Sequence, residues 1–273
     1  MRGRIVALGG FLGFLTACGG GPPAPPALAY GVPADPEVTY LVTDTAVISI
    51  EALGQSLALD VGSEAVYGIV FGRADDGVMI TVGIEDLDAT LGVPMAGPMT
   101  FDESSVTGDL VFTLGRRGDV TVVSTPDFDE AARQLVPPEQ VAHSFFPTLP
   151  GRAVAMGDAW SDTVAFESEG GGRQRTILDY TVVGDTVVDG ASLLHVTFRG
   201  TSEMTLALSM QGTEIEQTTN LDLGGHFLWD LQGGLLYERA TSMDGRGTVR
   251  TPLLPGELPT RFEMRSFARL QPE

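Results

Sequence analysis

The chain has 273 residues, of which 43% are hydrophobic, so it holds enough apolar material for a sizeable folded core. It carries 36 acidic and 16 basic residues, for a formal net charge of −20. This charge argues against binding nucleic acid, which requires clustered cations, and against docking flat on an anionic lipid surface. An acidic surface of this kind mainly keeps a protein soluble and apart from its neighbours.

The amino terminus is typical of a secretory leader. Two arginines within the first four residues precede an uncharged apolar stretch, residues 5–15, which is too short to span a bilayer. The stretch ends in Leu15-Thr16-Ala17-Cys18, which resembles the lipobox cut by the lipoprotein signal peptidase. We therefore expect a signal peptide over residues 1–17 and acyl chains on Cys18, the only cysteine, which hold the protein on a membrane. The alternative is a free thiol at the end of an ordinary leader.

A spacer follows the cysteine. Residues 19–36 are rich in Gly and Pro, so residues 18–36 are predicted to be a lipidated cysteine followed by a tether. Gly19 stands where an Asp would be an inner-membrane signal. By resemblance to lipoprotein sorting in double-membraned bacteria, this implies an outer-membrane anchor with the domain facing the periplasm. A cell with a single membrane would invalidate that inference.

From Val38 onward, apolar residues recur with a period of two, as at Val78 to Ile84, Leu194 to Phe198 and Met204 to Met210. Such alternation is typical of strands with one buried face and one solvated face. Short Gly-containing turns between the strands favour antiparallel meanders. The sequence predicts an all-β-dominated fold in one domain, residues 37–273. We expect a large curved antiparallel sheet or half-barrel, built from two meander halves over about 37–126 and 151–273.

One segment departs from this pattern. Asp127, with Glu130 three positions later, is typical of a helix cap and predicts a helix to about Val136. Two prolines end that run, and residues 139–146 predict another turn or two. The sequence thus predicts a short helical insert around residues 127–146.

No catalytic constellation is visible. The three histidines, His143, His195 and His226, lack neighbours at metal-ligand spacing, and the folded part has no thiol, so we expect no metal site. Neither a nucleophile elbow nor a phosphate-binding Gly loop is present. We expect no enzyme activity and no cofactor, although residues distant in sequence could still converge.

One motif carries a family resemblance. The stretch 146–150, Phe-Pro-Thr-Leu-Pro, is followed by Val154-Ala155-Met156-Gly157-Asp158-Ala159-Trp160. This Leu-Pro and Val-x-x-Gly-Asp-x-Trp signature resembles uncharacterised bacterial lipoproteins, and the outline of the chain is similar to LolA/LolB-like carriers. That resemblance implies a curved half-barrel whose concave face holds acyl chains and which has no catalytic residues. The chain departs from the carriers in its smaller helical content and its Pro-rich tether.

The resulting functional hypothesis is a non-catalytic, membrane-anchored envelope lipoprotein that binds a hydrophobic or lipid ligand in the concavity of the sheet. The alternative is a protein–protein interaction scaffold of the cell envelope, in which the same apolar side chains fill a core. The expected partners are the membrane through Cys18, a lipid or hydrophobic ligand, and an envelope protein, but not nucleic acid. The residues predicted to line the ligand site are Met79, Phe198, Met204, Met210, Trp229 and Met264.

Overall fold

The computed structural model describes residues 26–52, 54–93, 97–129, 138–167, 172–210, 213–250, 252 and 256–272. Its elements, in chain order, are β1 (Glu37–Ala52), β2 (Gln55–Ala74), β3 (Gly77–Val93), β4 (Gly97–Asp102), η1 (Glu103–Ser105), β5 (Val106–Thr107), β6 (Leu110–Leu114), β7 (Val120–Ser124), β8 (Asp127–Phe128), α1 (Pro138–Phe145), β9 (Ala159–Glu167), β10 (Arg173–Val188), β11 (Ala191–Met210), β12 (Thr213–Asp230), β13 (Leu235–Arg250) and β14 (Glu257–Leu270).

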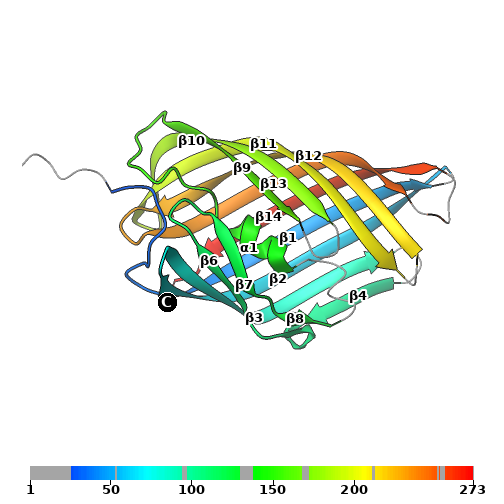
Figure 1. The fold of residues 1–273 in the computed structure, drawn as a ribbon, viewed down its shortest axis with the longest axis horizontal. Coiled ribbons are helices and arrows are strands. Elements are labelled where there is room, and N and C mark those ends of the chain that lie inside the picture. The colour runs from blue at the N-terminus through cyan, green and yellow to red at the C-terminus, as the bar shows by residue number, and fades with distance from the viewer. Residues whose placement is uncertain are drawn as a thin grey trace, which may run out of the picture.

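Twelve of these strands form one antiparallel sheet (Figure 1). The order is β7-β6-β3-β2-β1-β14-β13-β12-β11-β10-β9, with β4 paired to β3, so the sheet is not closed. The remaining short strands β5 and β8 pair with each other. This architecture confirms the predicted all-β fold with its two meanders and short helical insert.

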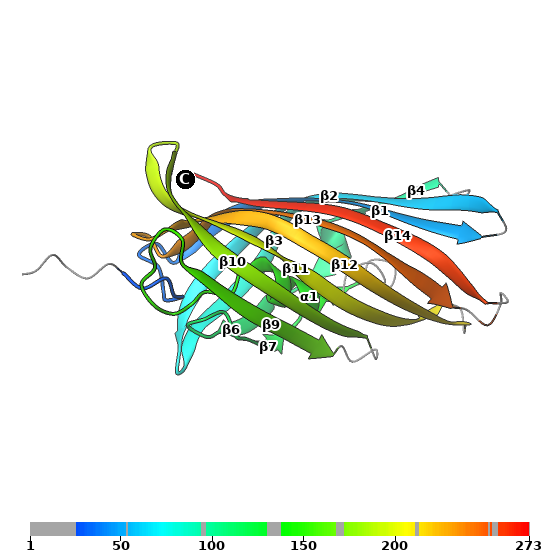
Figure 2. The same ribbon diagram turned by 90° about the horizontal axis from the view of Figure 1, so that it is seen from above.

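The chain path explains where the helix lies. The first meander steps outward from β1 to β7, and the second starts at the opposite edge, β9, and returns to pair β14 with β1. The segment that joins the two edges carries α1, which lies within the curve of the sheet (Figures 1 and 2). The sheet therefore has an inner face, which contacts α1, and an outer face that looks away from it.

Strand alternation decides which residues reach each face. On β1, Tyr40 and Val42 are buried on the inner face, and Tyr40 contacts the Phe145 ring of α1 with centroids 5.3 Å apart. Successive residues of a strand point to opposite faces, so Leu41 and Thr43 belong to the outer face. The strand register carries this assignment across the sheet, because directly paired residues share a face.

The core lies between α1 and the inner face. Tyr30 packs edge-on against Phe146 and Trp229, with ring centroids 5.8 and 5.3 Å apart. The Tyr30 hydroxyl donates a hydrogen bond to the Pro147 carbonyl. Leu28, which is fully buried, forms a β-bridge with Arg152.

This packing corrects part of the predicted tether. The sequence predicts a lipidated cysteine and a Gly- and Pro-rich tether over residues 18–36, but Leu28 and Tyr30 are buried in the hydrophobic core, where Tyr30 packs against Phe146 and Trp229. Residues 1–25, which include the predicted signal peptide and Cys18, lie outside the described residues.

The start of the predicted helix is also corrected. Asp127 does not cap a helix but pairs with Thr107 in the β5–β8 ladder. A tertiary partner strand thus outweighs the local capping pattern in this place. Residues 130–137 lie outside the described residues, and the second part of the prediction, residues 139–146, is confirmed by α1.

Strand curvature depends on glycines of the inner face. A Cβ on Gly247 would lie 2.0 Å from the Thr218 carbonyl oxygen, and one on Gly245 would lie 2.3 Å from that of Asn220. Both approaches are far shorter than van der Waals contact. Glycine at these positions therefore lets β13 lie close against the bent β12, as glycines do where sheets turn sharply.

The first prediction compares two strand glycines. Gly247→Ala should lower the free energy of unfolding by about 1 to 3 kcal/mol, because backbone atoms must move to admit the methyl group. Gly62→Ala is the matched control, since a Cβ on Gly62 meets nothing within 4 Å, and it should be neutral or slightly stabilising. Urea unfolding of the two variants measures the difference. Equal stability of both would contradict the proposed role of Gly247.

Candidate functional site

Beyond α1, the inner face continues as an apolar surface that is only partly covered. One row across the sheet pairs Met243 with Met264, Met264 with Ala46, and Ala46 with Val61. All four are partly exposed, unlike the buried residues around α1. We name the distal inner face as the partly exposed inner-face residues on this side of α1: Ala46, Ile48, Ile50, Leu59, Val61, Met204, Leu223, Met243, Phe262 and Met264.

The two faces of this region differ sharply in charge. On the outer face, Asp222, Asp244 and Glu263 occupy one cross-strand row, and all three are exposed. On the inner face of β1, β2 and β10 to β14, from Asp44 and Arg239 to the distal strand ends, these two are the only charged residues among the described positions. The distal inner face is thus suited to an apolar partner and the outer face to water.

The structure divides the predicted lining residues. Met204 and Met264 lie on the distal inner face, as expected. Phe198 and Trp229 are on the inner face but buried in the core, so they do not line the distal inner face. The side chain of Met210 lies outside the described residues.

The prediction that Met79 lines the ligand site is wrong. Met79 lies between Val78 and Ile80, both of which are buried on the inner face, so its own side chain points outward. Hydrophobicity alone favoured Met79 as a lining residue, whereas the period of two places it on the opposite side.

Sequence patterning did not find the polar centre of the inner face. Arg239 lies on β13, where its Nη1 donates a hydrogen bond of 3.0 Å to the Phe145 carbonyl at the end of α1. Its guanidinium carbon lies 5.6 Å from the centroid of the Phe198 ring. Asp44 lies on β1 opposite Ser266, which donates a hydrogen bond to its carboxyl. The signal in the sequence is a charged residue at an inner-face position of an alternating strand.

Both charged groups are incompletely satisfied. The Nε of Arg239 and the Oδ1 of Asp44 are buried atoms without a hydrogen-bond partner. Leaving a buried donor or acceptor unpaired costs about 1 to 3 kcal/mol each. Burial raises the pKa of the Asp44 carboxyl, while Ser266 and the charge of Arg239 oppose that shift. Burial likewise lowers the pKa of the Arg239 guanidinium, against the influence of Tyr180, Tyr30 and Asp44.

Small polar residues occupy the inner face nearer the distal strand ends. Thr176 and Ser202 are buried and joined by a hydrogen bond of 2.8 Å, and Gln217 donates one of 3.1 Å to the buried Thr219. The Oγ1 of Thr260, on the neighbouring strand β14, is buried without a partner. These groups are neutral, so this end of the inner face is polar without being charged.

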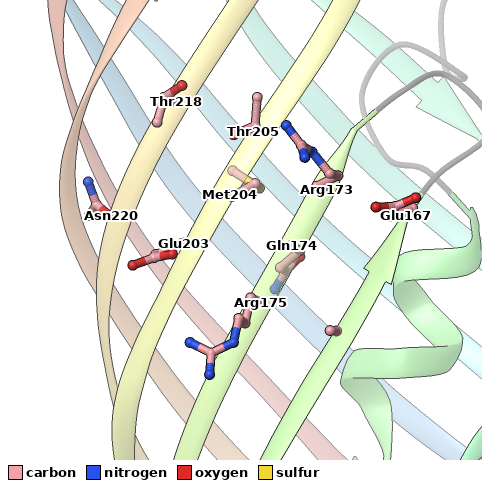
Figure 3. Close-up of a pocket in the computed structure, with 10 residues that line it drawn as sticks. Glu167, Arg173, Gln174, Arg175, Glu203, Met204, Thr205, Thr218 and Asn220 are labelled. Carbon is pink, nitrogen blue, oxygen red and sulfur yellow. The ribbon is translucent and has the colours of Figure 1, made fainter.

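A groove of about 450 Å³ lies over β9 to β12, and its lining includes Met204 and Gln174 (Figure 3). Arg175 pairs across strands with Glu203, and Arg173 pairs with Glu167. Strand alternation assigns these four side chains to the outer face, opposite Met204 and Gln174. The groove carries both signs of charge and open access, which makes it a poor site for an apolar ligand.

Two of the histidines contact each other, and the residues of the sequence motif make contacts within the fold. The rings of His195 and His226 lie 5.4 Å apart, and burial lowers the pKa of His195, with His226 adding to that effect. Trp160 of the Val-x-x-Gly-Asp-x-Trp signature stacks on Tyr180 at 5.1 Å, and Asp158 accepts a hydrogen bond from the Ala155 amide in the turn before β9.

No cluster of metal-binding side chains occurs within the described ranges. In the same part of the chain, none of the helices has both the length and the apolar character that crossing a bilayer would require.

Comparisons with known proteins assign no family. No family model matches the chain, and no curated protein matches it. Among solved structures, the beta domain of the Bordetella autotransporter BrkA aligns with 86% of this chain and 99% of its own length, at 9% identity and a TM-score of 0.26. A similarity this remote supports neither a shared fold nor a shared function.

The second prediction concerns Asp44. Because its pKa is raised in the folded chain above the ordinary value of 3.8, the folded state binds the proton more tightly than the unfolded state. The stability that this group contributes is therefore full at low pH and falls as the pH rises from about 4 through the raised value. Asp44→Asn removes this fall, so the free energy of unfolding of the variant should improve relative to wild type between about pH 4 and pH 7.

Urea unfolding at the two pH values measures this change. Asp244→Asn, on the exposed outer face, is the matched control and should track the wild type. A constant difference between the Asp44 variant and the wild type would show that the carboxyl titrates as if it were in water.

Proposed function

We propose that this protein is a non-catalytic lipoprotein of the cell envelope, anchored through acyl chains on Cys18, and that it binds a hydrophobic or lipid ligand on the distal inner face. The observation that carries the proposal is the distal inner face, whose residues are apolar and partly exposed. Burying apolar surface there is favourable by about 0.8 kcal/mol for each methylene of an acyl chain. Methionines supply part of the surface, and their flexible side chains adapt to chains of different shape.

The position of the termini is consistent with this role. The first described residues and the carboxyl terminus lie together at the end of the sheet where the β10–β11 and β12–β13 turns are (Figure 1). A tether that leaves from this end directs the opposite, distal end of the strands away from the anchoring membrane. With an outer-membrane anchor, the distal inner face would be presented to the periplasm.

The third prediction tests the anchor. The mature chain should begin at residue 18 and carry acyl chains, and Cys18→Ser should move the protein from the membrane to the soluble fraction, because a polypeptide tether alone has no affinity for the bilayer. Intact mass analysis and membrane fractionation measure both outcomes. An unmodified thiol, or a different first residue, would refute the anchor without bearing on the ligand.

The fourth prediction tests the ligand face with two neighbouring residues. Ile48→Asp places a charge on the distal inner face and should weaken binding of an apolar fluorescent probe at least about tenfold, because a charge is costly to bury without a partner. Val47→Asp is the matched control, since Val47 lies on the outer face of the same strand and is 39% exposed. Native mass spectrometry of gently purified protein should also show co-purifying lipid, and less of it with Ile48→Asp.

Thermal unfolding should show that both variants are folded, because Ile48 is partly exposed and Val47 is exposed. Equal probe binding by both, or a wild-type protein that takes up neither probe nor lipid, would refute a ligand site on this face.

One feature favours an interaction scaffold as a second candidate. The sheet ends in two unclosed edges, β7 and β9, and Val123 on β7 is 60% exposed. Open strand edges offer backbone groups to a partner strand. Cross-linking of the full chain to an envelope protein through β7 or β9, together with an inner face that takes up no probe, would favour the scaffold over the carrier.

A further inference from the structure

The inner face holds a buried hydrogen-bond donor and a buried hydrogen-bond acceptor that have no partner. The donor is the Nε of Arg239 on β13 and the acceptor is the Oδ1 of Asp44 on β1. Arg239 pairs with Ala268 of β14, and Asp44 pairs with Ser266 two residues before it, so the two side chains project from adjacent inner rows on either side of β14. The two charges act on one another, although no ion pair joins them in the described part of the chain.

Their other contacts do not account for both groups. The hydrogen bond to the Phe145 carbonyl uses only Nη1 of Arg239 and leaves Nε unpaired. The hydrogen bond that Ser266 donates to Asp44 likewise leaves Oδ1 unpaired. Buried polar groups in native proteins are nearly always paired, so an unpaired donor and an unpaired acceptor in adjacent rows of one face indicate a place for a third group.

Resting on the function proposed above, we propose that Arg239 and Asp44 bind the head group of the ligand, and that this head is neutral and carries a hydroxyl, as in a monoacylglycerol. A hydroxyl accepts a hydrogen bond from Nε and donates one to Oδ1, so it satisfies both atoms at once. A carboxylate head would be repelled by Asp44, and an ammonium head by Arg239. The tail then lies across Met264 and Met243 toward the distal end.

The approach to this site is through flexible side chains. Met264 occupies the inner position next to Ser266 on β14, and Met243 pairs directly with it. Both are partly exposed, and methionine changes rotamer at little cost. Their displacement gives a head group access to the two buried atoms without any change in the strands.

The test uses the full chain reconstituted into phosphatidylcholine vesicles that contain a trace of photoactivatable lipid. One probe is a monoacylglycerol and the other is the fatty acid of the same length, each with a diazirine near the chain end, at about pH 9 so that the acid is ionised. The wild type should cross-link the monoacylglycerol about tenfold more than the acid, with labelled peptides from β1, β13 or β14. Asp44→Asn should raise labelling by the acid, and Arg239→Met should lower labelling by the monoacylglycerol about tenfold.

Two exposed outer-face variants, Asp244→Asn and Arg265→Met, are matched controls and should leave both labelling yields unchanged. Thermal unfolding establishes that each variant is folded, and if Arg239→Met is not, Asp44→Asn alone decides the question. Labelling of the inner face by both lipids equally, in wild type and Asp44→Asn alike, overturns the head-group site, with water alone left to fill it. Absence of inner-face labelling by either lipid, together with failure to bind an apolar probe, overturns the proposed function itself.

Discussion

The strands are much longer than the helix, and this difference in length determines how much of the inner face the fold can bury. Strand β11 has 20 residues, which extend over about 66 Å, whereas α1 has 8 residues and a length of about 12 Å. A single short helix therefore covers only part of the inner face, and the aromatic core around Tyr30, Phe146 and Trp229 lies next to it, through the contact between Phe146 and Phe145. The remaining inner face keeps its apolar residues without a described layer over them.

Because residues of the long strands alternate strictly between the two faces, the part of the inner face that α1 does not cover forms a continuous surface. Every second residue of a strand must face inward, so a sheet that continues past its core presents a largely uncharged inner face to whatever lies there. The outer face carries the charge, as the row of Asp222, Asp244 and Glu263 illustrates. A surface of this kind can bind an apolar ligand or another apolar body, and the ligand proposed above is of the first kind.

Local patterns predicted the sheet well and the site only in part. Period-two alternation correctly identified the strands, because each strand has one wet face, and it placed Met204 and Met264 on the inner side. It failed for Met79, where the pattern itself places the side chain outward. It also could not reveal that Trp229 is covered, because the residue that covers it, Tyr30, comes from the segment assigned to the tether.

The polar centre shows why long-range register limits such predictions. Arg239 and Asp44 are 195 positions apart, and only the β1–β14 and β13–β14 pairings bring them to adjacent rows of one face. A charged residue at an inner-face position is visible in the sequence, but its meaning depends on the partner that the register supplies. With Asp44 in the adjacent row, the proposed head-group site would hold both signs of charge and would disfavour a carboxylate as well as an ammonium. The specificity of the site would then follow from strand register more than from the composition of its lining.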